Sequence, residues 1–501
     1  MTLAPDARAA AALELALGDA GDRFNPFGWH QALALDEREA FPEALANELI
    51  RHGVLLHFVP RRDGGRLESI TEAALLMRVA ARRDLTAAIA LGQAFLGSVP
   101  VWLKGDAQQR ARQAQALGQG RLAALALTEE AHGSDLLATS TRLEGGALTG
   151  AKWLINNATR GELLTVLARS NDGPGLSACT LVQLDKPAAT GWKTLPKIAT
   201  HGIRGADISG IALEQAGPVT PLGNEGSGIE LTLKALQVTR IGCAAFSLGA
   251  ADTALRLALE FATGRKLYGA TAFDIPHVRA VLTTAFLDLL IAEAVSIGAW
   301  RGLHLAPEQM SLASAVTKYF VPTRCEQLIR DVAVVFGARH WLREGYFQKL
   351  MRDASVVSLF DGSTAVNLEG IALQLSRLKG PGDPTRAKQR FDTSAPAPAF
   401  TGDGLELMGP GHDDVLGLPP ELPDRRDRRS PQTFELAHRA ATHYAAQSCR
   451  AFAPPWLDAA LERLERGRLV DSQELTSQLL ALHAEQRWFS HFAVPLRQTP
   501  L

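Results

Sequence analysis

The spacing of the apolar residues changes twice along this chain of 501 residues. In residues 1–121, alanine and leucine recur at three- and four-residue intervals, as in AALELAL and AFPEALANELI, which predicts an N-terminal helical domain. Over 122–228, short β-like runs broken by glycine and asparagine predict a middle β domain. Helical spacing returns over 229–378 and predicts a C-terminal bundle of four or five helices. The fold is therefore expected to be mostly α with a central, β-barrel-like domain.

Proline marks the end of the predicted bundle. Nine of the 26 prolines lie within 379–433, where the apolar residues show little periodicity, so we expect a linker or long surface loop. Residues 434–501 include amphipathic stretches such as LDAALERLERGRLV and predict a helical extension. We expect this extension to pack on the bundle or on a neighbouring subunit, or to assist docking of a substrate donor. Its removal at about residue 380 is expected to leave a folded protein.

The charge balance and the cysteines limit the classes of partner. Lysine and arginine number 52 against 53 acidic residues, so the net charge of -1 gives no field that would attract nucleic acid. The four cysteines are far apart and fit neither a metal-binding spacing nor a dense disulfide framework. We therefore expect no metal site and no nucleic-acid partner.

One uncharged stretch, from Leu85 to Leu103, has nearly the length of a membrane span. It contains glycines, polar residues and Pro100, which favour a buried helix that breaks near the proline. The first residues, MTLAPDARAA, lack the basic region and apolar core of a signal peptide. We expect no membrane span and a cytoplasmic location.

The first motif that suggests a function is LTEEAHGSD, Leu127 to Asp135, at the start of the β domain. It resembles the TEPxxGSD signature of the acyl-CoA dehydrogenase family, in which this segment wraps the flavin and its serine lies near the thioester ligand. The resemblance assigns Thr128 and Ser134 to FAD binding, and Ser134 to substrate binding as well. Taken alone, the Ser-Asp pair is more often a helix cap or a turn.

A second motif, GAKWLINNA from Gly150 to Ala158, is similar to the GxKxWITNG strand of the same family. Asn156 stands where the family has the threonine that hydrogen-bonds the flavin N5 region, and an amide can still supply that bond. The resemblance therefore assigns Asn156 to FAD. Trp153 stands one place before the family's tryptophan, and without the resemblance it would be interpreted as an ordinary core aromatic.

Two later segments resemble family segments that bind the FAD of an adjacent subunit. GRKLYGATAFDIPHV is similar to RxxFGxxxxxxQ, with Pro276 in place of the glutamine, and it assigns Arg265 and Tyr268 to the dinucleotide. Gly337 remains from the family's glycine cluster and is assigned to FAD binding too. The resemblance implies FAD at a subunit interface, and hence a homodimer or homotetramer.

The resemblance also identifies the residues expected to take part in the reaction. LFDGSTAVNLEG, beginning at Leu359, resembles IYEGTSQIQR, in which the glutamate removes the α proton of the bound thioester; Asp361 takes its place, and Ser363 is assigned to FAD. Aspartate is one methylene shorter, so the substrate must approach by roughly 1 to 1.5 Å. Thr239 and Arg240 align beside this base and are assigned to the substrate, with Arg240 also assisting catalysis. The alternative for Asp361 is the N-cap of a helix.

The implied activity is FAD-dependent α,β-desaturation of an acyl thioester, with an electron-transfer flavoprotein as the usual acceptor in the family. Gln237 stands where many members have an acid that contacts pantetheine, and Ala365 replaces a glutamine that commonly contacts FAD. The donor is therefore left open between an acyl-CoA and a carrier-protein-bound acyl group. Two alternatives remain: a flavin oxidase similar to the nitroalkane oxidases, which also use aspartate as base, and a catalytically degenerate homologue that only binds or scaffolds.

Overall fold

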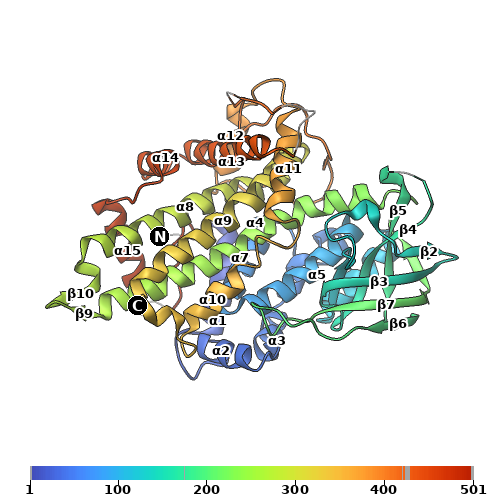
Figure 1. Ribbon diagram of the computed structural model, residues 1–501, viewed down its shortest axis with the longest axis horizontal. Coiled ribbons are helices and arrows are strands. Elements are labelled where there is room, and N and C mark those ends of the chain that lie inside the picture. The colour runs from blue at the N-terminus through green and yellow to red at the C-terminus, as the bar shows by residue number, and fades with distance from the viewer. Residues whose placement is uncertain (1–2, 174, 420, 424–428, 498–501) are drawn as a thin grey trace.

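The computed structural model describes residues 3–173, 175–419, 421–423 and 429–497, and it has the predicted order of a helical domain, a β domain and a helical bundle (Figure 1). The N-terminal domain contains six α-helices. They are α1 (Arg8–Leu17), α2 (Trp29–Glu37), α3 (Glu43–Arg51), α4 (Ile70–Arg83), α5 (Leu85–Lys104) and α6 (Ala107–Gly118). The predicted helical character of this region is confirmed.

Helix α5 corrects one detail of the sequence interpretation. It does not break at Pro100 but continues to Lys104, with the proline inside the helix. A proline removes one backbone hydrogen bond, yet α5 is enclosed on nearly all sides, so packing holds it in one piece. Gly97 permits this packing, because a Cβ atom there would lie 2.6 Å from the backbone of Ala124 in the first strand.

Three helices, α5, α7 (Gly228–Gly264) and α8 (Pro276–Leu305), are long and apolar enough to cross a membrane, judged by length and composition alone. In each, between 89% and 94% of the most apolar window is buried inside the protein. Burial by neighbouring helices accounts for their apolar character, as expected for α5 from its sequence.

The middle domain is an eight-stranded sheet with the order β6-β7-β3-β2-β4-β5-β8, and β1 pairs in parallel with β4. Its strands are β1 (Leu122–Ala126), β2 (Arg142–Glu144), β3 (Ala147–Asn156), β4 (Gly161–Arg169), β5 (Cys179–Asp185), β6 (Thr190–Thr194), β7 (Ile208–Gly217) and β8 (Val219–Pro221). The β-like runs RLAALAL, ALTGAKWLI, ELLTVLARS, LSACTLVQL and DISGIALEQ correspond to β1, β3, β4, β5 and β7. The sheet forms the half-barrel that adjoins one end of the helices in Figure 1.

The bundle has five α-helices, at the upper end of the predicted number. In addition to α7 and α8 it contains α9 (Met310–Phe336), α10 (Tyr346–Ala354) and α11 (Thr364–Leu375). A small hairpin of β9 (Lys266–Leu267) and β10 (Ala270–Thr271) joins α7 to α8. This hairpin lies at the end of the molecule opposite the β domain (Figure 1).

The segment expected as a linker or long surface loop, 379–433, is largely irregular and exposed where the structure describes it, but several of its residues are buried against the rest of the protein; residues 420 and 424–428 lie outside the described part. It contains helix α12 (Pro384–Phe391), and its apolar side chains Phe391, Phe400 and Leu405 are buried. The backbone N–H of Phe400 also donates to the carbonyl of Glu68 at 2.9 Å. These apolar residues, spaced irregularly among the prolines, give no periodic signal but still supply core contacts.

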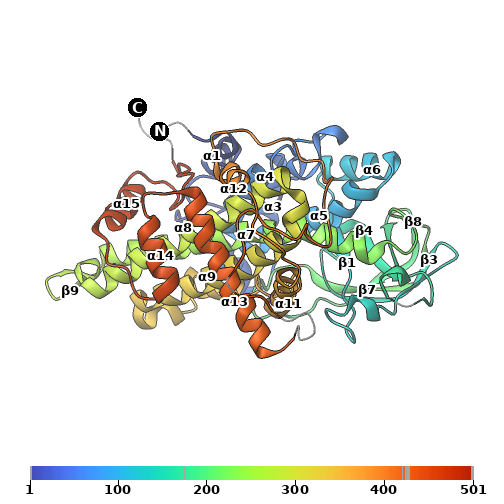
Figure 2. The same ribbon diagram turned by 90° about the horizontal axis from the view of Figure 1, so that it is seen from above.

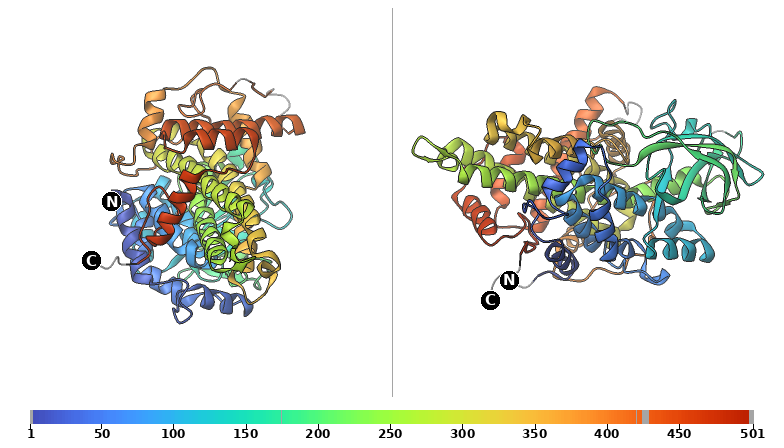
Figure 3. Two further views of the ribbon diagram at one scale, coloured as in Figure 1. Left: turned by 90° about the vertical axis from the view of Figure 1, so that its left-hand side faces the viewer. Right: turned by 90° about the horizontal axis from the view of Figure 1, so that it is seen from below.

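The helical extension is confirmed and packs on the bundle of its own chain. Its helices α13 (Pro431–Phe452), α14 (Leu457–Arg466) and α15 (Gln473–Ala484) lie along one side of the bundle, in orange and red (Figures 2 and 3). Beyond α15, the side chains of Trp488 and Phe489 are fully buried in the main hydrophobic core. The end of the extension is therefore part of the main hydrophobic core.

Candidate active site

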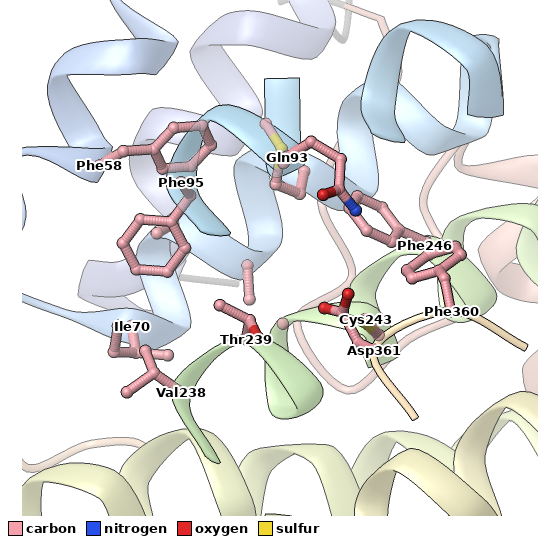
Figure 4. Close-up of a pocket in the computed structure, with 15 residues that line it drawn as sticks. Phe58, Ile70, Gln93, Phe95, Val238, Thr239, Cys243, Phe246, Phe360 and Asp361 are labelled. Atoms are coloured by element: carbon pink, nitrogen blue, oxygen red, sulfur yellow. Dashed lines mark hydrogen bonds between the residues drawn. The ribbon is translucent and has the colours of Figure 1, made fainter. Parts of the chain in front are cut away.

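A mainly apolar pocket lies where the N-terminal domain meets the bundle. Its cavity of about 40 Å³ lies between α4, α5, α7 and the loop before α11 (Figure 4). Apolar side chains and glycines form most of its wall: Phe58, Ile70, Ala73, Ala74, Met77, Gly92, Phe95, Val238, Gly242, Phe246 and Phe360. The polar residues of the lining are Gln93, Thr239, Cys243 and Asp361. Asp361 is therefore the one carboxylic acid among the described residues that line this pocket.

The backbone around Asp361 turns sharply before α11. Asp361 has a φ of 55° and Gly362 a φ of 99°, both in the left-handed region. Aspartate tolerates this conformation better than most residues, and glycine adopts it freely. A Cβ atom at position 362 would also lie 2.9 Å from Nη2 of Arg240, so a side chain there would displace the guanidinium group.

Asp361 is not the N-cap of α11. The cap is Ser363, whose side chain accepts a hydrogen bond from the backbone N–H of Val366 at 3.5 Å. The alternative interpretation of Asp361 as a helix cap is therefore wrong. Its carboxyl group is free to face the pocket, as Figure 4 shows.

Two cations, partly buried Arg240 on α7 and buried Lys318, hold the loop that carries Asp361. Arg240 donates from Nε to the backbone carbonyl of Asp361 at 2.9 Å. Lys318, on α9, donates from Nζ to the carbonyls of Val357 at 2.7 Å and Gly362 at 3.3 Å. Both cations bind backbone oxygens rather than the carboxylate, so they fix the loop while leaving the side chain of Asp361 available.

Burial raises the pKa of Asp361 above its ordinary value, while the positive charges of Lys318 and Arg240 oppose that rise. Cys243 lies beside it, with Sγ 3.6 Å from Oδ2 of Asp361. Burial, followed by the charge of Asp361, raises the pKa of Cys243 well above its ordinary value, so the sulfur stays a thiol that can donate to the carboxylate. A carboxylate in an apolar pocket with a raised pKa has the properties of a general base.

The sequence interpretation missed Lys318 and Cys243. A signal for Lys318 exists, because a lysine inside the otherwise apolar run SLASAVTKYFV must find buried partners if the run is a core helix. Cys243 gives no such signal, since a cysteine in a buried helix is commonly an inert core residue.

Thr239 and Arg240 are brought to Asp361 as the sequence predicted, Thr239 in the pocket wall and Arg240 behind the loop. Gln237, two residues earlier on α7, is engaged elsewhere. Its Nε2 donates to the backbone carbonyl of Glu406 at 2.7 Å. The segment before α13 thus covers Gln237, so no polar group from this residue faces the pocket.

Three of the predicted cofactor residues, Thr128, Ser134 and Asn156, lie in the β domain. The loop that carries Thr128 is anchored by Glu129, which forms a buried ion pair with Lys152 at 2.8 Å. Burial acts to raise the pKa of Glu129, but hydrogen bonds led by that from Lys152 lower it to about 2. Ser134 is exposed, and Oδ1 of Asn156 is buried without a hydrogen-bond partner.

Ser363, at the N-cap of α11, lies close to Asp361, but Arg265, Tyr268 and Gly337 are not brought to this site within one chain. Arg265 and Tyr268 lie at the β9–β10 hairpin, at the opposite end of the bundle, and Tyr268 is 97% exposed. Gly337 follows α9 as its C-cap, with a φ of 56°. It lies at the same end of the bundle as the hairpin, because its neighbour Phe336 packs on Phe261 of α7 with ring centroids 5.1 Å apart. A second chain would be needed to join the two sets of residues.

Comparison with known proteins decides the family. Residues 29–121, 124–216 and 226–376 match the acyl-CoA dehydrogenase N-terminal, middle and C-terminal domains, in that order. The chain belongs to the acyl-CoA dehydrogenase family. It is 24% identical to the probable acyl-CoA dehydrogenase FadE25 of Mycobacterium tuberculosis over 342 residues. The aligned region covers 67% of this chain and 88% of FadE25.

Two solved structures share the fold. One is an acyl-CoA dehydrogenase from Bacillus anthracis complexed with FAD, with a TM-score of 0.68 and 18% identity over 99% of this chain and 92% of that one. The other is the prolyl acyl carrier protein oxidase AnaB, with a TM-score of 0.62 and 20% identity over 69% of this chain and 96% of AnaB. The overlap with the Bacillus structure extends over nearly the whole chain, including the region beyond the three family domains.

Proposed function

We propose that the protein is an FAD-dependent dehydrogenase that desaturates the α,β carbon pair of an acyl thioester, with Asp361 as the base that removes the α proton. The observation that carries the proposal is the carboxyl group of Asp361, with its raised pKa, at the wall of an apolar pocket. Loss of the α proton to this carboxylate accompanies loss of the β hydrogen as hydride. Two C–H bonds break and one C=C bond forms.

The residues of the β domain fit a flavin beside the pocket. Oδ1 of Asn156 is a buried acceptor without a partner, and apolar Leu154 and Leu359 are 42% and 61% exposed. A flat, partly apolar ring with N–H groups would cover such a surface and satisfy the amide. Thr128, Ser134, Asn156 and Ser363 would hold it, and bound FAD would supply the hydride acceptor.

Arg265, Tyr268 and Gly337 would hold the FAD of a second copy, which supports a homodimer or homotetramer with the cofactor at its interface. The exposed ring of Tyr268 and its distance from the β domain of the same chain favour this assignment. An electron-transfer flavoprotein as acceptor and a cytoplasmic location complete the proposal. The acyl substrate is carried either by CoA or by an acyl carrier protein, the carrier that appears in the name of AnaB.

The experiment that tests the proposal begins with the visible spectrum of the purified protein, followed by anaerobic addition of acyl thioesters. We expect a bound flavin whose oxidised absorbance is lost when a thioester is added. Absence of flavin would favour a binding or scaffolding homologue. Reduction of the flavin by a small nitroalkane, with rapid reoxidation in air, would favour a flavin oxidase similar to the nitroalkane oxidases. That alternative is supported by Asp361, because those oxidases also use an aspartate as base.

Replacing Arg265 with alanine should weaken retention of FAD by about ten- to a hundredfold, the effect of losing a charge-assisted hydrogen bond to phosphate. The arginine is exposed, so the thermal unfolding of the apoprotein should not change. Lys266→Ala, next to it on the same hairpin, is the control and should retain FAD. The flavin-to-protein ratio after gel filtration measures the effect, and an unchanged ratio in Arg265→Ala would remove Arg265 from the site.

Replacing Gly242 with leucine should obstruct the pocket without harming the fold. No atom lies within 4 Å of a Cβ built at Gly242, so the first carbon of a new side chain enters open space. Leucine also favours a helix more than glycine does. We expect acyl thioester binding, measured by calorimetry, to weaken by about one to two orders of magnitude.

The matched control for Gly242→Leu is Gly118→Leu at the end of α6, outside the pocket, where an added Cβ meets only the side chain of Leu56 at 3.7 Å. Unaltered thioester binding in Gly242→Leu, with a normal thermal transition, would show that the acyl group lies elsewhere.

A further inference from the structure

Gln93 is a buried amide that points into the pocket from α5 (Figure 4). Its side chain is polar, while the residue as a whole is only 8% exposed. Within the described part of the chain, neither its amide nitrogen nor its amide oxygen has a hydrogen-bond partner. Its carbonyl is an acceptor and its NH2 group is a double donor, so it can bind many neutral polar groups.

The other buried glutamines in the described residues show what a structural glutamine does in this protein. Each of them forms at least one side-chain hydrogen bond within the fold. They are Gln109, Gln113, Gln183, Gln237, Gln309 and Gln374. Gln93 differs from all of them, because its partner is not supplied by the fold.

The surroundings of Gln93 offer no alternative role. The wall around it is apolar, with Phe58, Phe95 and Phe246 among its neighbours in the pocket (Figure 4). The remaining polar groups of the lining, those of Thr239, Cys243 and Asp361, gather where the proton is to be removed. The amide of Gln93 faces the pocket, where a bound group could complete its hydrogen bonds, whereas a leucine would fill the same wall without needing a partner.

We propose that Gln93 recognises a polar group on the acyl chain, so that the substrate is an acyl thioester with a hydroxyl, keto or amide group beyond the β carbon. This inference rests on the proposed function, because it assumes that the pocket holds the acyl group. A site built to hydrogen-bond such a group discriminates against the plain hydrocarbon chain, since that chain leaves the amide unpaired. Gln93 is then the residue that determines acyl specificity.

The test compares binding of hexanoyl N-acetylcysteamine thioester with that of its analogues carrying one hydroxyl on each carbon beyond the β carbon in turn. The short arm is common to CoA and carrier-protein substrates, so the donor does not affect the comparison. Binding is measured by calorimetry on flavin-loaded Asp361→Asn protein, which prevents turnover, with Gln93 intact or replaced by leucine. Gln115→Leu, at an exposed glutamine on α6 outside the pocket, is the matched control because it makes the same chemical change away from the substrate.

We expect at least one hydroxylated probe to bind about tenfold more tightly than the hexanoyl probe when Gln93 is present. Gln93→Leu should reverse that order, and Gln115→Leu should preserve it. Equal binding of all the probes to the protein with Gln93 intact would overturn the inference alone. An equal loss for every probe in Gln93→Leu would also overturn it, by placing the amide at the thioester. If no probe binds, both the inference and the proposed function fail.

Discussion

Replacing Asp361 with asparagine should slow the reduction of bound flavin by an acyl thioester by at least about two orders of magnitude. Asparagine keeps the size of the side chain and tolerates the left-handed backbone at this position, but it cannot accept the α proton. Arg240 and Lys318 bind backbone carbonyls of the loop, so their bonds survive the change. We therefore expect normal flavin content and a slow reductive step in anaerobic stopped-flow measurements.

The pH dependence of the same step gives a second test of Asp361. The base must be ionised, and burial raises the pKa of this carboxyl group above the ordinary aspartate value. The reductive rate should rise with pH through that raised pKa and level off above it, and Asp361→Asn should remove the rise. Full thioester-driven reduction in the asparagine variant would show that another group is the base.

Asp361→Glu distinguishes two forms of the pocket. If the pocket has closed around the shorter acid, the extra methylene should push the carboxylate past the α carbon and lower the rate. If the pocket keeps room for a glutamate, the rate should stay or rise. Retained flavin and an unaltered unfolding transition are the controls in both cases.

The sequence predicted most of the fold because the periodicity of its apolar residues is strong where elements are buried. The core strands β3, β4 and β5 stand out as β-like runs, whereas β6, with the sequence TGWKT and no fully buried residue, does not. The packing of 379–433 could not be predicted either. Its buried residues are scattered among prolines, and only tertiary contacts show which of them reach the core.

The candidate site was predicted unevenly, for a related reason. The resemblance located Asp361, Thr239 and Arg240, because these residues lie in segments with recognisable patterns. It could not reveal that Ser363 caps α11, that Lys318 supports the loop, or that Gln93 lacks a partner. The roles of Lys318 and Gln93 depend on distances between α5, α9 and the loop, which are far apart in sequence.

Removing the chain from about residue 380 should give insoluble or unfolded protein, because the extension completes a cluster of buried charges. Nε1 of Trp488 donates to Glu14 at 2.8 Å, and the N–H of Phe489 donates to Asp252 at 2.8 Å. The two acids in turn bind Arg82, at 2.6 and 2.9 Å. Truncation would remove these donors and expose the charged cluster and the apolar surface around it.

A single substitution isolates this contribution. Trp488 is fully buried, and the guanidinium group of Arg78 lies 4.8 Å from its ring centroid. Trp488→Ala should therefore lower the free energy of unfolding by about 3 to 5 kcal/mol, through the cavity and the lost packing. Trp488→Phe keeps most of the ring but removes the hydrogen bond to Glu14, and it should cost about 1.5 to 3 kcal/mol.

Phe24→Ala, at a residue that is 84% exposed, is the matched control and should change stability by less than about 0.5 kcal/mol. Chemical denaturation of the flavin-loaded protein measures all three. A soluble, cooperatively folding truncation, or a Trp488→Ala variant as stable as Phe24→Ala, would show that the bundle is complete without the extension.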